Sequence, residues 1–391
     1  MNGKERMLTA MRRGIPDRVP VAPDISNMIP ARLTGKPFWE LYLFDNPSLS
    51  DAYMGAVRKF GFDAWYLYGK LRGTRQDMGT ATDSAYDIGG FSVHPDLVQR
   101  TLVDDRPAKY VEEVVIETPL GKLDSQTIYF PDNSPWPSVG LIKDPVVDWP
   151  RLRWLMGDEW SFPTSLPDYD VVGDLGVYAI SLDLPVDWWI RQRDQGDEMA
   201  LYDFADRPDL MDEIMEFYFQ YSLARIKACI AARPDEVVFQ GSRSSLSLIS
   251  PTIYRRYNLP WIKALTKLTK EAGLVAHQHT CGRSWKLVEM NYAETDLDVM
   301  EPLEPPPGGD VDLALAKQRF GDKFCLKGNV NTFVTMLGPT EEVEAAARKC
   351  IDDAAAGGGY ILSTGDQCGR DTPDANIYKL VEVAERYGRY Q

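Results

Sequence analysis

The second half of the chain alternates strand-like and helix-like segments five times. Apolar runs that predict strands cover residues 235–240, 274–279, 297–301, 324–329 and 360–363. Each run precedes a segment with helical spacing, over 252–272, 283–292, 311–319, 340–355 and 374–387. Strands that are each followed by a helix pair in parallel, so this half predicts a doubly wound sheet or a barrel.

The first half repeats the same pattern less regularly. Helices are predicted over 4–13, 47–60 and 207–232, and strands over 18–22, 63–68 and 172–184. Residues 80–150 show β-type alternation instead. Within them, Val114 to Thr118 and Leu123 to Phe130 flank a short Pro-Leu-Gly-Lys stretch and predict a hairpin. We therefore expect residues 70–165 to be an insertion or cover segment.

Charge and composition exclude several classes of partner. The net charge of −15 makes nucleic acid and anionic membranes poor partners. The five cysteines are odd in number and widely spaced, which favours reduced thiols over a disulfide framework. The chain has no run of 18 apolar residues, and its start lacks the apolar segment of a secretory signal. We expect a cytoplasmic protein.

Metal-binding residue types concentrate in one short stretch. Residues 276–282 hold two of the three histidines, His277 and His279, together with Cys281. If the stretch is a strand, these side chains share one face, because alternate residues of a strand point the same way. His277 lies one repeat deeper and is more typical of a core or supporting histidine than of a ligand.

Further polar residues follow the neighbouring predicted strands. Glu301 and Asn329 end two of them, and Asp366 and Cys368 come just after the last. Catalytic groups of an α/β barrel gather at the carboxyl ends of its strands, so one mouth would collect these side chains. Thiolates, imidazoles and carboxylates are common zinc ligands. The alternative is that the cysteines pack as small apolar residues.

Several separate stretches resemble the uroporphyrinogen decarboxylase superfamily. They are Lys4-Glu5-Arg6, Pro16 to Val21, Ser250-Pro251, His279 to Gly282, Gly328-Asn329, Gly357 to Leu362 and Thr372 to Ile377. The resemblance covers essentially the whole chain except residues 70–165. It implies a single TIM (β/α)8 barrel over residues 1–391, with 70–165 as a hairpin-bearing insertion.

The resemblance also favours one of two branches. The decarboxylases have an arginine-rich segment after the first strand that binds substrate carboxylates, whereas residues 22–32 here contain Asp24 and one arginine. His279, Cys281 and Cys368 instead fill the His-X-Cys and distant Cys positions of the zinc-dependent corrinoid methyltransferases. Glu301 stands where some members offer a fourth, exchangeable ligand. Its alternative role is that of a solvated or salt-bridged loop acid.

This branch implies a zinc enzyme that moves methyl groups. The expected reaction transfers methyl from a small donor, with a methoxylated aromatic favoured (O-demethylation), to the cob(I)alamin of a partner corrinoid protein. A Lewis acid would disperse charge on the leaving atom. The alternatives are transfer between methylcobamide and a thiol such as coenzyme M, transfer to tetrahydrofolate, a decarboxylase-like lyase, and a non-catalytic zinc protein or a metal-free member of the superfamily.

Candidate substrate contacts complete the prediction. Asp24 and Asn329 join Glu301 as candidate catalytic residues. Tyr360 and Asp183 are candidate polar residues of the substrate pocket. Arg243 follows a predicted strand, where it would bind a substrate carboxylate or pair with a loop acid. Six aromatic residues would either cover a ring-bearing substrate or build the core: Trp65, Tyr66, Tyr68, Trp136, Trp188 and Trp189.

Overall fold

The structure, a computed structural model, describes residues 1–79 and 85–390; residues 80–84 of the predicted insertion lie outside this part. Seven strands form one parallel sheet in the order β1-β10-β11-β12-β13-β14-β15. Their bounds are Ala64–Gly69, Gly176–Asp183, Glu236–Gln240, Val275–His279, Val299–Glu301, Cys325–Val330 and Tyr360–Thr364. Each strand of the second half thus lies where the alternation of the sequence predicts it.

The predicted strand over 18–22 closes this sheet into a ring. Val21 forms a parallel bridge with Leu362 of β15. On the other side, the backbone N–H of Asp63, next to β1, donates to the carbonyl of Val21 over 2.8 Å. The segment pairs through single bridges rather than a continuous ladder. The ring still has eight members, which confirms the predicted barrel rather than the doubly wound sheet.

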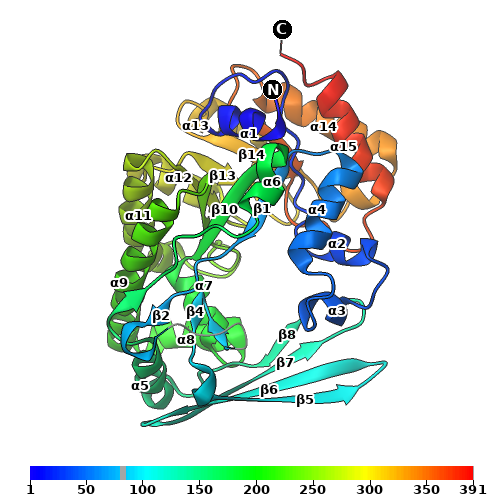
Figure 1. Ribbon diagram of the computed structural model, residues 1–391. Helices are drawn as coiled ribbons and strands as arrows, with labels where there is room; N and C mark the ends of the chain where they lie inside the picture. Colours follow the sequence, from blue (N-terminus) through cyan, green and yellow to red (C-terminus); the bar gives the residue numbers. More distant parts are fainter. Residues whose placement is uncertain (80–84, 391) are drawn as a thin grey trace.

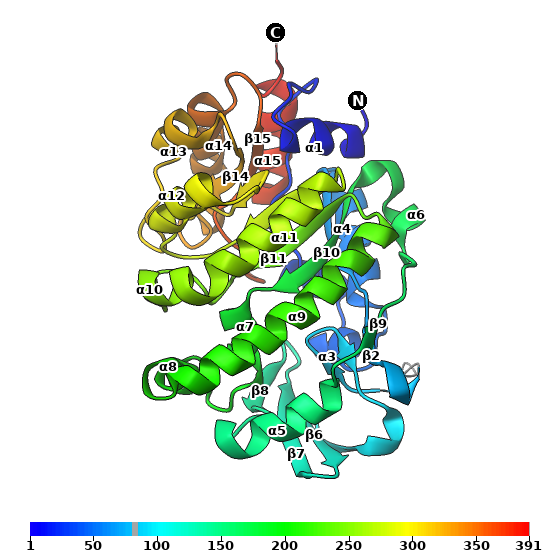
Figure 2. The same ribbon diagram turned by 90° about the vertical axis from the view of Figure 1, so that its left-hand side faces the viewer.

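Helices surround the ring on its outer side (Figure 1). Those of the barrel repeat are α4 Leu49–Phe60, α9 Pro208–Ala232, α11 Leu259–Glu271, α12 Trp285–Glu294, α13 Leu313–Phe320, α14 Thr340–Ala354 and α15 Asp374–Arg386. Figure 2 shows α9 and α11 lying across β10 and β11. The helices that the sequence did not predict include α2 Met28–Leu33, α3 Phe38–Tyr42, α5 Pro145–Met156, α7 Pro185–Gln192 and α8 Gly196–Asp206. None of the helices within the described ranges combines the length and apolar character needed to cross a bilayer.

The first helix, α1 Gly3–Met11, closes one end of the barrel. Its N-terminus is fixed by a capping box, in which Asn2 and Glu5 satisfy each other's backbone N–H groups. Met7, Ala10 and Met11 are fully buried. They pack with residues at the starts of the strands, such as Val275 of β12 and Val299 of β13. Because this end is filled, the functional face is the opposite one, where the strands end.

The connection between β1 and β10 is long and carries its own sheet. Four antiparallel strands lie in the order β5 Val98–Asp105, β6 Lys109–Thr118, β7 Gly121–Tyr129 and β8 Trp136–Val139. The predicted hairpin is the β6–β7 pair, with Pro119 and Leu120 at its turn. Figure 1 shows this sheet at the end of the molecule away from the two termini. The division into one barrel and an insertion over 70–165 stays a prediction.

Short elements complete the same connection. Small antiparallel pairs form between β2 Thr74–Arg75 and β9 Trp160–Ser161, and between β3 Asp87–Ile88 and β4 Phe91–Ser92. A short helix, α6 Tyr169–Val172, then leads towards β10. The β3–β4 turn brings Gly89 and Gly90 back to the mouth of the barrel, where they line a cavity.

Candidate metal and substrate site

A cluster of three ligand-type side chains lies where two strands end. His279 is the last residue of β12, and its Nε2 lies 2.9 Å from Sγ of Cys281. The Cys281 thiol in turn donates to Oδ1 of Asp366, just after β15, over 3.2 Å. One ligand atom from each of the three residues lies within 4.8 Å of the other two. Imidazole nitrogen, thiolate and carboxylate oxygen are the donor types that zinc prefers, so the set fits this ion.

Glu301, at the end of β13, orients His279. One carboxylate oxygen accepts a hydrogen bond from Nδ1–H of His279, and the other accepts from Nζ of Lys327 over 3.1 Å. Burial would raise the pKa of Glu301, but the charges of Lys327 and His279 hold it well below its usual range. When His279 loses its second proton, as metal binding requires, the bond to Glu301 keeps the remaining proton on Nδ1 and leaves Nε2, which points at Cys281, to bind the metal.

A buried polar column continues below the cluster. Nζ of Lys327 lies 3.4 Å from the centroid of the Trp65 ring, and that ring stacks with His277. Nδ1 of His277 lies 2.8 Å from Oε2 of Glu236. Lys327, His277 and Glu236 are completely buried. His277 is therefore a residue of the barrel interior, beneath the cluster, as the sequence pattern favoured.

Cys368 lies in a different setting from Cys281. It is completely buried, its backbone N–H donates to the carbonyl of Asp24 over 2.8 Å, and burial raises its pKa to about 12. Burial likewise raises the pKa of Cys281 to about 11. Within the part of the chain that the structure describes, the group of three contains Asp366 rather than Cys368. Metal binding by Cys368 stays a prediction.

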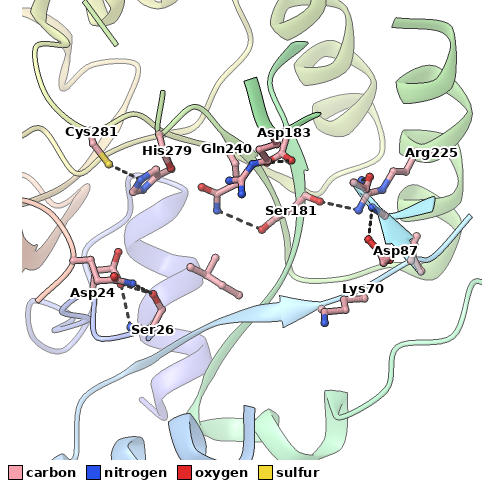
Figure 3. A pocket seen from close by; sticks show the side chains of 18 of the residues that line it. Asp24, Ser26, Lys70, Asp87, Ser181, Asp183, Arg225, Gln240, His279 and Cys281 are labelled. Atoms are coloured by element: carbon pink, nitrogen blue, oxygen red, sulfur yellow. Dashed lines mark hydrogen bonds and ion pairs between the residues drawn. The ribbon is translucent and has the colours of Figure 1, made fainter. Parts of the chain in front are cut away.

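A cavity of about 770 Å³ opens beside the cluster (Figure 3). Asp24 and Asp183, two of the predicted site residues, line it together with His279 and Cys281. Asp24 is fully buried, and burial together with the charge of Glu301 raises its pKa. Its carboxylate accepts hydrogen bonds from the backbone and hydroxyl of Ser26.

The other predicted substrate residues lie outside the cavity wall. The Tyr360 hydroxyl donates to the carbonyl of Gly328 over 2.5 Å, and Asn329 Nδ2 donates to the carbonyl of Leu303 over 2.8 Å. Arg243 pairs at 3.2 Å with Asp197, an acid in the first turn of α8 rather than in a loop. These polar groups thus already bind backbone carbonyls or a carboxylate of the protein itself. Their catalytic or substrate-binding roles stay predictions.

Of the two roles that the sequence offered for the aromatic residues, the structure favours the core. Trp65, Trp188 and Trp189 are buried in the core, while Trp136 is 61% exposed on β8. No Trp, Tyr or Phe belongs to the described wall of the cavity. The large rings instead pack against one another under the helices; Trp188, for example, stacks on Tyr218 with centroids 4.4 Å apart.

Four cations in the wall escaped sequence reasoning: Lys70, Arg72, Arg191 and Arg225. Arg191 pairs with Asp183 at 3.3 Å, and Arg72 pairs with Asp87 at 3.5 Å. One signal could have revealed Arg225. It falls on the buried face of α9, among apolar and aromatic residues, where an unpaired arginine is rare.

Comparisons with known proteins agree with this architecture. Residues 193–387 match a family model described as Uroporphyrinogen decarboxylase (URO-D). A solved structure of a methyltransferase from Methanosarcina mazei superposes over 99% of both chains with a TM-score of 0.63 and 16% identity. At that identity the likeness shows the fold.

The names of the curated relatives describe two different activities. The methylcobamide:CoM methyltransferase MtbA of Methanosarcina mazei is 27% identical over 180 residues, 46% of this chain and 50% of the relative. The uroporphyrinogen decarboxylase of Paraburkholderia phytofirmans is 26% identical over 189 residues, 47% of this chain and 48% of the relative. The match thus spans about half the length of these relatives. The chain belongs to the uroporphyrinogen decarboxylase superfamily, with relatives in its corrinoid methyltransferase branch.

Proposed function

We propose that this protein is a zinc-dependent methyltransferase that moves a methyl group from a small donor to the cob(I)alamin of a partner corrinoid protein. The observation that carries the proposal is the group of His279, Cys281 and Asp366 at the edge of a cavity. The likeness to methylcobamide:CoM methyltransferases supports methyl transfer as the reaction class.

His279, Cys281 and Asp366 would hold the zinc, and Glu301 would keep His279 in the binding tautomer. When bound, zinc supplies Lewis acidity to the atom that loses or gains the methyl group. It also supplies the positive charge that a buried thiolate needs, since burial alone keeps Cys281 protonated. Cys368, the ligand implied by family resemblance, is the alternative third protein ligand.

For the donor we propose a methoxylated aromatic compound, as the sequence favoured. In that reaction the methyl–oxygen bond breaks with its electron pair staying on oxygen, the methyl group passes to the cobalt of cob(I)alamin, and the phenolate takes up one proton. Asp24 lines the cavity and would deliver that proton. A volume of about 770 Å³ holds one substituted ring. Because the wall is polar, the ring would carry polar substituents.

A second candidate is methyl transfer between methylcobamide and a thiol, which the names of the curated relatives favour. A zinc ion held by three protein ligands keeps one position open, and this position would hold the thiol as thiolate. A decarboxylase has less support, because Arg32, the one arginine of residues 22–32, pairs with Asp374 instead of lining the cavity.

The test is a methyl-transfer assay with zinc-loaded protein, cob(I)alamin or a corrinoid protein, and a panel of methoxyarenes, methylamines and methylthiols. We expect the spectrum of methylcobalamin to appear with one class of donor and to depend on His279 and Cys281. In the reverse direction, methylcobalamin with thiols tests the second candidate. If neither direction proceeds with stoichiometric zinc bound, the proposed function is wrong.

A further inference from the structure

The end of the cavity away from His279 contains a buried guanidinium whose charge no described carboxylate neutralises through an ion pair. Arg225 is 7% exposed and lines the cavity. It donates to the backbone carbonyls of Gly89, over 3.2 Å, and Ser181, over 3.0 Å. Its Nε has no hydrogen-bond partner among the described residues. A buried charge without a partner is costly, so this geometry is typical of a site that receives an anion.

The surrounding backbone is shaped to hold Arg225. Gly90 has a φ of 86°, and a Cβ at this position would lie 2.7 Å from Cζ of Arg225. The positive φ favours glycine at this turn, and the absence of a side chain leaves room for the guanidinium. Two of the five N–H groups of an arginine are used by the carbonyls, which leaves one on each of Nη1 and Nη2 for a ligand, while the N–H of Nε is buried without a partner among the described residues.

A second free cation, Lys70, lies at the same end of the cavity (Figure 3). Its ammonium group forms no ion pair within residues 1–79 and 85–390. The two acids nearby, Asp87 and Asp183, are already paired with Arg72 and Arg191. This end therefore has an excess of positive charge, whereas the metal end carries the carboxyl groups of Asp24 and Asp366.

The distance between the two ends suits one small molecule. Arg225 reaches the cavity at Ser181 of β10, and His279 ends β12, two strands away in the sheet. Adjacent strands are spaced so that this separation is about 10 Å. Gln240 and Ser242 line the wall between the ends and offer hydrogen bonds. A ring with substituents on opposite sides spans such a gap.

We propose that the small substrate is a monocarboxylate, whose carboxylate binds Arg225 and Lys70 while its methyl-bearing atom lies beside His279 and Cys281. The guanidinium fork matches a carboxylate in two parallel hydrogen bonds. The paired acids Asp87 and Asp183 flank the site and disfavour a doubly charged group such as phosphate. This inference rests on the proposed function for the reaction, but the anion site stands on its own geometry.

The test compares 3- and 4-methoxybenzoate with the corresponding methoxybenzamides. Binding is measured by titration calorimetry on the zinc-loaded protein without corrinoid, and methyl transfer is measured separately with cob(I)alamin. We expect the carboxylates to bind at least tenfold more tightly than the amides. Lys70→Ala, at an exposed position, should weaken carboxylate binding several-fold with little change for the amides. Lys267→Ala, on the outer helix α11, is the matched control and should change neither.

Arg225→Gln should abolish the preference and raise KM for the carboxylates more than it lowers kcat. Lys70→Ala keeps the test valid if the buried substitution disturbs folding. Carboxylate binding without methyl transfer would contradict the proposed function and leave the anion site intact. Equal binding of carboxylates and amides, or a preference that survives both substitutions in folded protein, would overturn the anion site, even if neutral donors are demethylated.

Discussion

The two ends of the cavity are built in different ways. The metal end consists of side chains at or just after the ends of β12 and β15, and a buried ion pair between Glu301 and Lys327 supports it. The cationic end consists of Arg225 from an outer helix and Lys70 from the segment after β1, and backbone carbonyls hold the arginine. The metal end uses only residues at or just after strand ends, whereas the cationic end takes its arginine from α9, in the connection between β10 and β11.

This difference separates reaction chemistry from substrate choice. Strand ends of a closed barrel are fixed relative to one another, so a metal site built on them keeps its geometry. Connections between strands change length and sequence with much less cost to the fold. We therefore expect the metal end to decide what reaction occurs and the cationic end to decide which molecule undergoes it.

The largest expected effect is at the metal end. Cys281→Ser and His279→Ala should each lower zinc affinity by more than the roughly 10- to 100-fold that loss of a supporting hydrogen bond produces, and should abolish methyl transfer. Metal content after dialysis against a chelator, together with activity, measures this. Asp366→Asn and Cys368→Ser form a matched pair that identifies the third ligand. Full zinc retention in both single ligand variants would contradict the assignment of His279 and Cys281.

The next effect concerns the ion pair beneath the metal. Lys327→Met leaves the Glu301 carboxylate buried without its cation, so the free energy of unfolding should fall by about 3–5 kcal/mol. Chemical denaturation measures it. The control, Lys286→Met, breaks an exposed pair with Glu289 and should change stability by less than about 1 kcal/mol. An equally small fall in the free energy of unfolding for both variants would show that this charge pair does not stabilise the column under His279.

The smallest effect is a pH dependence near the cationic end. Asp187 on α7 is fully buried and accepts hydrogen bonds from the Arg243 backbone and the Ser244 hydroxyl. Burial raises its pKa from 3.8 to about 7. A carboxyl with a raised folded pKa stabilises the fold at low pH, and that contribution is lost as pH rises towards 7.

Asp187→Asn removes this titration. The Tm of the variant minus that of the natural protein should therefore increase between pH 5 and pH 8. Asp197→Asn, which changes the exposed partner of Arg243, should leave the corresponding difference nearly constant. A constant difference for both variants would mean that Asp187 has an ordinary pKa.

Sequence periodicity predicted parallel strands that are each followed by a helix, because this signal is repeated along the chain. The choice of a barrel over a doubly wound sheet came from the family resemblance. Each β-strand from β11 to β15 begins within two residues of its predicted start, and His279 and Cys281 were found from residue type alone. Asp366 was placed at the mouth but given no role, because the loop that turns it towards Cys281 has no periodic signal. The hairpin was predicted because its two strands are adjacent in sequence and joined by a short turn.

The cationic end could not be predicted in the same way. Arg225 and Gly89 are far apart in the sequence, and only the path of the long connection brings them together. The helices α2, α3, α5, α7 and α8 belong to connections as well, and they form because tertiary contacts cover them. The sequence left the tryptophans between a substrate cover and the core, because burial in the core and contact with a ligand select the same residue type.

Helix α1 has a kinetic consequence. Because Met7, Ala10 and Met11 fill one end of the barrel, both the small substrate and a corrinoid protein would approach through the same opening. A protein that covers this opening traps whatever lies inside. The small substrate would then bind first, and its demethylated product would leave only after the partner has undocked. Initial-rate and product-inhibition patterns should therefore be ordered, whereas a random pattern would indicate a second route into the barrel.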